Sequence, residues 1–190
     1  MLANLFISKV RIKLLNLFLT GDDEELHVRA IVRTLDEEIN AVRRELQNLH
    51  SIGLLTWRKS SNKKFFKLNE RHLFVKELRE LAYKNRNDVN LLYKSLEKFE
   101  EIEVALLTDD YLQRENEKSP GVDLLIVGTP NLQILTKELK NVEKSLGIEL
   151  KVSALSNEDL LFALKKRDEF ILNILDGEGI YLIGNKIKLS

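Results

Sequence analysis

The chain has 190 residues, 44% of them hydrophobic and 32% charged, a composition typical of one ordinary globular domain or two small ones. It contains no cysteine, which excludes disulfides, zinc–cysteine sites and thiol catalysis. The net charge of zero hides an asymmetry, because residues 1–86 carry 17 Lys and Arg against 11 Asp and Glu, whereas residues 87–190 carry 13 against 19. A basic half followed by an acidic half predicts two modules, the first with a polyanionic partner.

The N-terminal run MLANLFISKVRIKLLNLFLT is apolar enough to suggest a signal peptide. Lys9, Arg11 and Lys13 interrupt the run, and no small-residue cleavage site follows it. No segment approaches the roughly 18 uninterrupted apolar residues that a membrane span needs. We therefore expect a cytoplasmic protein without a membrane partner.

Three helices are predicted in the first third of the chain. The first follows Ser8, a plausible N-cap, and ends before Gly21, and the second lies in HVRAIVRTLD. The third is INAVRRELQNLHSIG, in which apolar residues recur at the spacing of one buried stripe: Ile39, Val42, Leu46 and Leu49. These patterns predict a small helical core.

The opposite face of the third helix carries long polar side chains. Arginine can make two hydrogen bonds to guanine, and asparagine or glutamine can make two to adenine. A face that simply meets solvent is the alternative interpretation of such a helix taken alone. The residues of this face are Asn40, Arg44, Gln47 and Asn48, and Arg43 lies on its flank.

A basic hairpin is predicted immediately after this helix. LLTWRK and KKFFKL are strand-like runs around the turn SSN, and Leu55, Trp57, Phe66 and Leu68 form their apolar face. Cations surround the hairpin tip, where they repel one another unless an anion binds there. These cations are Arg58, Lys59, Lys63, Lys64 and Lys67.

Residues 1–70 resemble the ArsR-like winged helix-turn-helix transcription regulators, through HVRAIVRTL and INAVRRELQNLHSIGLLTWRKSSNKKFFKLN. The resemblance implies that the helix from Ile39 enters the major groove of double-stranded DNA and that the hairpin contacts phosphates or the minor groove. The chain has Asp36-Glu37-Glu38-Ile39 where many relatives have Gly-Leu-Ser-Pro. Metal sensing in part of that superfamily uses cysteines, and the three histidines show no ligand spacing, so we expect structural roles for His27, His50 and His72.

Residues 71–101 have the pattern of two connecting helices, with a break at NRND, residues 85–88. A connector helix of winged-helix regulators commonly packs against its two-fold mate, so a homodimer is expected. Packing on the chain's own domains is the alternative.

The acidic half alternates strand-like and helical runs. IEVALLT, GVDLLIVGT, LGIELKVSAL and GIYLIGN are strand-like, and the helical patterns are NLQILTKELKNVEKSLG and SNEDLLFALKKRDEFILNILDGEG. This order predicts a small α/β domain over residues 102–190 with a mixed sheet.

The same residues resemble the nucleotidyltransferase-like domain of the DNA polymerase beta superfamily, most strongly in VDLLIVG, LGIELKVSALSNEDL and RDEFILNILDGEGIYLIG. An active member needs a Gly-Ser pair after the first strand to hold the triphosphate. It also needs Asp-x-Asp on the second strand and a third carboxylate nearby, which together bind two divalent ions.

This sequence departs from that pattern at each critical place. Asp109-Asp110 stands where Gly-Ser is expected, and Gly121 replaces the first metal-binding aspartate. Asp123 keeps the second place and Glu149 is a plausible third carboxylate, which makes the pair a vestigial metal site. Asp123 could equally be a polar residue at a strand start. We expect no catalytic residues, no cofactor and no enzymatic activity.

The sequence thus predicts an α+β protein with a winged helix-turn-helix (1–70), a helical connector (71–101) and an inactive nucleotidyltransferase-like domain (102–190). The predicted function is a DNA-binding transcription regulator whose second domain serves dimerisation, binding of a protein partner or sensing of a nucleotide ligand. Two alternatives stay open. One is an active nucleotidyltransferase targeted by its winged helix, and the other is a self-regulating interaction protein of a two-component pair.

Overall fold

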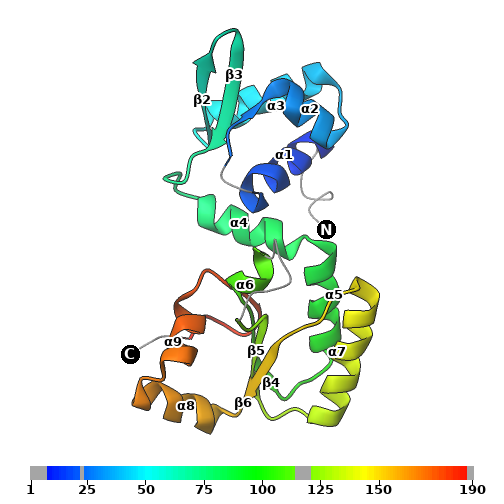
Figure 1. Cartoon of the computed structure of the whole chain (residues 1–190), viewed down its shortest axis with the longest axis vertical. Coiled ribbons are helices and arrows are strands. Elements are labelled where there is room, and N and C mark those ends of the chain that lie inside the picture. The colour runs from blue at the N-terminus through cyan, green and yellow to red at the C-terminus, as the bar shows by residue number, and fades with distance from the viewer. Residues whose placement is uncertain (1–7, 22–23, 114–120, 188–190) are drawn as a thin grey trace. The chain divides into compact units, whose positions relative to one another are not determined.

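The computed structural model describes residues 8–21, 24–113 and 121–187. Within these ranges the chain is an α+β protein with two sheets, and it divides into two compact units, Met1–Asn85 and Arg86–Ser190 (Figure 1). The start of the signal-like run and the polar loop at 114–120 lie outside the described residues. None of the described helices is long and apolar enough to cross a membrane.

The first unit contains the three expected helices and the hairpin. Ser8 caps the first helix, because its side chain accepts a hydrogen bond from the Arg11 amide at 3.2 Å. The hairpin gains a third strand, so that the antiparallel sheet has the order β1-β3-β2. The elements are α1 (Lys9–Thr20), β1 (Leu26–His27), α2 (Val28–Leu35), α3 (Ile39–Ser51), β2 (Leu55–Ser60), β3 (Lys63–Leu68) and α4 (Val75–Lys84).

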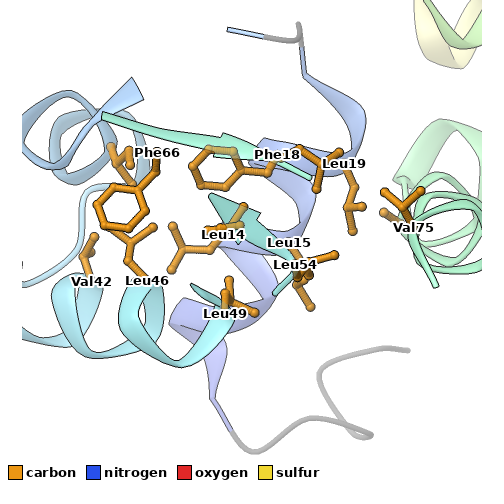
Figure 2. Packing of buried hydrophobic residues seen from close by; sticks show 14 residues of the cluster. Leu14, Leu15, Phe18, Leu19, Val42, Leu46, Leu49, Leu54, Phe66 and Val75 are labelled. Carbon is orange, nitrogen blue, oxygen red and sulfur yellow. The ribbon is translucent and has the colours of Figure 1, made fainter. Parts of the chain in front are cut away.

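One apolar core joins these elements. Val42 and Leu46 project from the buried stripe of α3, and Figure 2 shows the ring of Phe66 from β3 lying next to them. Leu14 of α1 and Ile31 of α2 are fully buried in the same cluster. The predicted stripe of α3 is therefore the face that holds the helix against α1 and the sheet.

The hairpin pairs Leu55 with Leu68 and Trp57 with Phe66, the register that puts the expected apolar residues on one face. Leu55, Phe66 and Leu68 are buried, but Trp57 keeps 39% of its surface exposed. The apolar face therefore ends at Trp57, and beyond it the hairpin extends into solvent with its lysines.

The second unit is built on a four-stranded mixed sheet of order β6-β5-β4-β7. Strands β5 and β6 are parallel, and the other neighbours are antiparallel. The elements are α5 (Asn87–Leu96), β4 (Ile102–Leu107), α6 (Asp109–Leu112), β5 (Leu124–Gly128), α7 (Leu132–Leu146), β6 (Val152–Leu155), α8 (Asn157–Lys166), α9 (Glu169–Asp176) and β7 (Ile180–Ile183).

Helices cover both faces of this sheet, with α5 and α7 on one side and α8 and α9 on the other (Figure 1). Leu106 and Leu125 pack against Leu160, Ile171 and Leu175 of α8 and α9. Because side chains alternate along a strand, the equally buried neighbours of Leu125 face the opposite layer. Burial on both faces explains why β5 reads as a continuous apolar run.

The two helices expected in the connector belong to different units. Helix α4 packs on α1, and the Arg79 guanidinium donates a 3.1 Å hydrogen bond to the Leu19 carbonyl. Helix α5 packs on α7 in the second unit. The break between the helices falls at Asn85 and Arg86, within the NRND segment.

Candidate functional site

The polar face of α3 points away from the core of the first unit. Asn40, Arg43, Arg44, Gln47 and Asn48 are all exposed, whereas Val42, Leu46 and Leu49 on the other side of the helix are buried. The helix therefore presents its long hydrogen-bonding side chains on one continuous surface.

Glu45 is the exception that the sequence pattern did not reveal. It is a charged residue of α3 that is 4% exposed, and its carboxylate accepts hydrogen bonds from the Arg11 guanidinium at 2.9 Å and the Asn48 amide at 3.3 Å. Burial raises the pKa of Glu45, but the hydrogen bonds from Ser8, Arg11 and Asn48 outweigh burial and hold the pKa below its usual range. Glu45 therefore stays charged, links α3 to α1, and orients Asn48 on the exposed face.

The acidic turn before α3 is occupied by interactions within the protein. The Glu38 carboxylate caps α3 by accepting a 2.8 Å hydrogen bond from the Ala41 amide, and backbone hydrogen bonds from Asn40 and Ala41 hold the pKa of Glu38 below its usual range. Glu37 pairs with Lys13 of α1 at 2.7 Å. Glu37 and Glu38 thus both contribute to the start of α3 through contacts within the protein.

A cleft of about 600 Å³ separates α3 from the hairpin and the start of α2. Leu46 and Phe66 contribute its apolar lining, and His27 and Val28 lie at its α2 side. The remaining lining is polar, with four cations among six side chains contributed by three separate elements and the hairpin turn. These residues are Arg29, Arg43, Gln47, Asn62, Lys63 and Lys64. An open, cationic cleft of this kind attracts an extended anion.

Arg29 was not predicted as a site residue. It occupies the first turn of α2, a helix on which the sequence indicated no binding residue. Pairing of β1 with β3 brings the start of α2 to the hairpin, and this pairing connects residues about 40 positions apart. No local sequence pattern predicts this pairing.

The cations of the hairpin do not all face the cleft. Arg58 instead pairs with Glu25, whose carboxylate accepts from the Arg58 Nε at 2.6 Å, and its guanidinium lies 5.2 Å from the centre of the Phe65 ring. The hydrogen bond from Arg58 lowers the pKa of Glu25. Lys59 is exposed near the tip. Lys64 lines the cleft, and its Nζ lies 4.2 Å from the Trp57 ring centre. Lys67 is partly buried.

The histidines take part in local hydrogen bonds. His27 caps α2 by accepting from the Ala30 amide at 2.9 Å. His50 accepts from the Trp57 indole at 3.2 Å and lies 2.9 Å from the Leu55 carbonyl, and His72 lies 3.2 Å from the Ile52 carbonyl. These partners support the structural roles expected from the sequence.

The second candidate site is the corner where β4 ends and β5 begins. Thr108 caps the short helix α6, so the chain turns directly from β4 into Asp109 and Asp110. The Asp110 carboxylate fills the space beside Gly121, where an added Cβ would overlap it. The Asp109 carboxylate lies against Gly177, with Oδ1 2.8 Å from the place of an added Cβ. Two acidic side chains therefore fill the space at this corner.

Asp123 is turned into the sheet. Its side chain is buried and its Oδ2 accepts a 2.8 Å hydrogen bond from the Lys151 amide, while its main chain pairs with Thr108 and Lys151. Glu149 is exposed and lies ahead of β6 rather than on it. These contacts give Asp123 the role of connecting the start of β5 to the segment before β6.

The side chains at this corner do not fit a two-ion centre. Gly121 offers no ligand atom, Asp110 blocks the place of one, and Asp123 uses an oxygen on a backbone amide. In the part of the chain that the structure describes, no three His, Asp or Glu residues gather in a way that could hold a metal ion.

Comparison with known proteins gives no match, whether to a family model, a curated protein or a solved structure.

Proposed function

We propose that this protein is a DNA-binding transcription regulator. The first unit is a winged helix-turn-helix in which α3 is the recognition helix and the β2–β3 hairpin is the wing. The second unit is a nucleotidyltransferase-like frame without catalytic groups, which serves dimerisation, partner binding or ligand sensing. The acidic side chains that fill the corner between β4 and β5 support the proposal that this unit is not catalytic.

One observation carries the DNA-binding proposal. The face of α3 that can hydrogen-bond to bases and the cations that can hold phosphates border the same cleft: Arg43 and Gln47 on one side, Lys63 and Lys64 on the other. The major groove is about 12 Å wide and admits one helix, while the adjacent phosphate backbone requires cations beside that helix. A solvated surface would not need charges of one sign from three elements.

The side chains around the cleft divide between two kinds of contact with DNA. Arg43 and Gln47 read base edges from α3, with Arg44 and Asn40 on the same face. Lys63 and Lys64 contact the backbone and fix the depth of α3. Arg58 is held by Glu25 and supports the hairpin rather than binding phosphate.

Selection of bound fragments from the source genome tests the proposal. The full chain should enrich a small set of sequences, and a matched variant with Lys63→Ala and Lys64→Ala should recover far less DNA. Lys137→Ala, an exposed lysine of α7 in the other unit, is the control and should enrich the same set as the parent chain. Equal recovery of all fragments by the parent chain and the Lys63/Lys64 variant would contradict the proposal.

A further inference from the structure

Helix α8 carries an exposed apolar face in the second unit. Leu161 and Phe162 are 56% and 64% exposed, although they are adjacent residues in the middle of a helix. Leu160 is buried against the sheet and anchors the opposite face. The Lys166 Nζ lies 5.8 Å from the Phe162 ring centre, so a cation of the same helix borders this apolar surface. Exposure alone does not identify a partner, because Leu132 and Ile134 of α7 are exposed to a similar extent.

The exposed face has a self-complementary order of side chains. Glu158, Leu161, Phe162 and Lys165 recur at i, i+3, i+4 and i+7, and all four are exposed. The sequence of this stripe is acid, apolar, apolar, base, and its midpoint lies between Leu161 and Phe162. Any partner of matching chemistry must present base, apolar, apolar, acid in the same direction.

A second copy of α8 running antiparallel presents that order. When a two-fold axis passes between Leu161 and Phe162, Glu158 of one copy faces Lys165 of the other, and this pairing occurs twice. Glu158 and Lys165 of one helix are about 10 Å apart along its axis, too far to pair with each other. Neither charge is therefore neutralised by the other within one helix.

We infer that α8 is a dimerisation helix, which packs antiparallel on α8 of a second copy of this chain through Leu161 and Phe162 with two Glu158–Lys165 pairs. This inference deepens the assembly role proposed for the second unit and rests on that part of the proposed function. It requires no DNA, so it is tested separately from the winged helix.

The charged ends of α8 have a second physical role, which the test must separate. An acid in the first turn and a base in the last turn favour the helix itself through its dipole. The cap does not depend on Glu158, because Ser156 and Asp159 form the capping box. Glu158→Lys and Lys165→Glu both oppose the dipole, so the double variant has the least stable α8.

Sedimentation equilibrium of the full chain is the experiment, without DNA. The parent chain should dimerise, and Glu158→Lys or Lys165→Glu alone should raise the dimer dissociation constant on the order of tenfold, because each creates two like-charged contacts. The double variant should dimerise like the parent chain, although its helix is weakened most. A mixture of the two single variants should form heterodimers, because every contact is then between opposite charges.

Apolar variants give a matched control. Leu161→Ser with Phe162→Ser should abolish the dimer, whereas Leu132→Ser with Ile134→Ser on α7 should leave it intact, although Leu132 and Ile134 are 60% and 54% exposed. A parent chain that stays monomeric to about 100 µM overturns the inference. So does a dimer that neither single charge variant weakens, or a double variant weaker than both, which is the signature of the helix dipole alone. Binding of a short duplex by the α8 variants reports separately on the winged helix.

Discussion

The two units place their charged side chains in opposite ways. In the first unit Arg43, Lys63 and Lys64 border an open cleft of about 600 Å³. In the second unit Asp110 lies against Gly121 and Asp123 is buried with its carboxylate on a backbone amide. Charges that face an open cleft are accessible to a ligand, whereas charges that fill the protein's own spaces are not. The difference supports the proposal that the first unit is the binding unit of this protein.

The largest expected effect that would break this contrast is nucleotidyl transfer by the second unit. We expect no nucleotidyl transfer from any nucleoside triphosphate with magnesium or manganese, because neither ion would have its carboxylates. Gly121→Asp alone should also fail, since the new side chain collides with Asp110. Adding Asp109→Gly and Asp110→Ser clears the corner and is the minimal repair.

Radiolabelled triphosphates, metal and host-cell extract provide the assay, with label on protein or nucleic acid as the signal. Transfer of label by the unmodified chain, lost in Asp123→Ala, would show that the corner is a working active site.

Removing the Asp123 carboxylate should reduce stability. Asp123→Ala leaves the Lys151 amide without the acceptor that now lies at 2.8 Å, and an unpaired buried donor costs about 1–3 kcal/mol. Asp123→Asn keeps an acceptor oxygen and should cost less. Glu149→Ala, at an exposed position, should change the free energy of unfolding by no more than about 0.5 kcal/mol. Urea unfolding measures all three, and an unchanged or raised stability in Asp123→Ala would instead favour a relic of metal binding.

The free energy of unfolding of both units should fall in acid, by less than the loss expected for Asp123→Ala. Glu45 beside Arg11 in the first unit and Asp88 beside Arg86 in the second are buried or partly buried carboxylates whose pKa is lowered. In both, burial raises the pKa and hydrogen bonds from arginine and other donors more than offset it. A lowered pKa contributes stability above the unfolded value, and that stability is lost as pH falls through the folded value.

Urea unfolding at about pH 6 and about pH 3.5 checks this expectation. Glu45→Gln should flatten the pH dependence of the first unit and Asp88→Asn that of the second. A parent-like slope in both variants would mean that other carboxylates set the acid response.

Local patterns predicted most elements but not the contacts that decide the sites. Capping indicated α1 and apolar spacing indicated α3, because each signal depends only on residues of its own helix. Ser8 caps α1, and the stripe from Val42 to Leu49 belongs to α3. The two-residue strand β1 was missed, since it exists only through pairing with β3. Burial of Glu45 was missed for the same reason, because its partner Arg11 lies 34 positions away.

The candidate sites show the same limit. Sequence alone indicated the polar face of α3 and the absence of a metal-binding side chain at position 121. It could not reveal that Arg29 joins the cleft, that Glu25 engages Arg58, or that Asp110 fills the space beside Gly121. Each of these depends on which segments the fold brings together.

The most direct test of the central claim is the salt dependence of binding to a selected duplex and to an unrelated one. Arg43→Ala should lose about 1–3 kcal/mol on the selected duplex and little on the unrelated one, because Arg43 is assigned to base edges. Lys63→Ala should weaken both alike and make the slope of log affinity against log salt shallower by about one unit, because it is assigned to a phosphate. Equal losses on both duplexes in Arg43→Ala, or no binding of either duplex at low salt, would contradict recognition by α3.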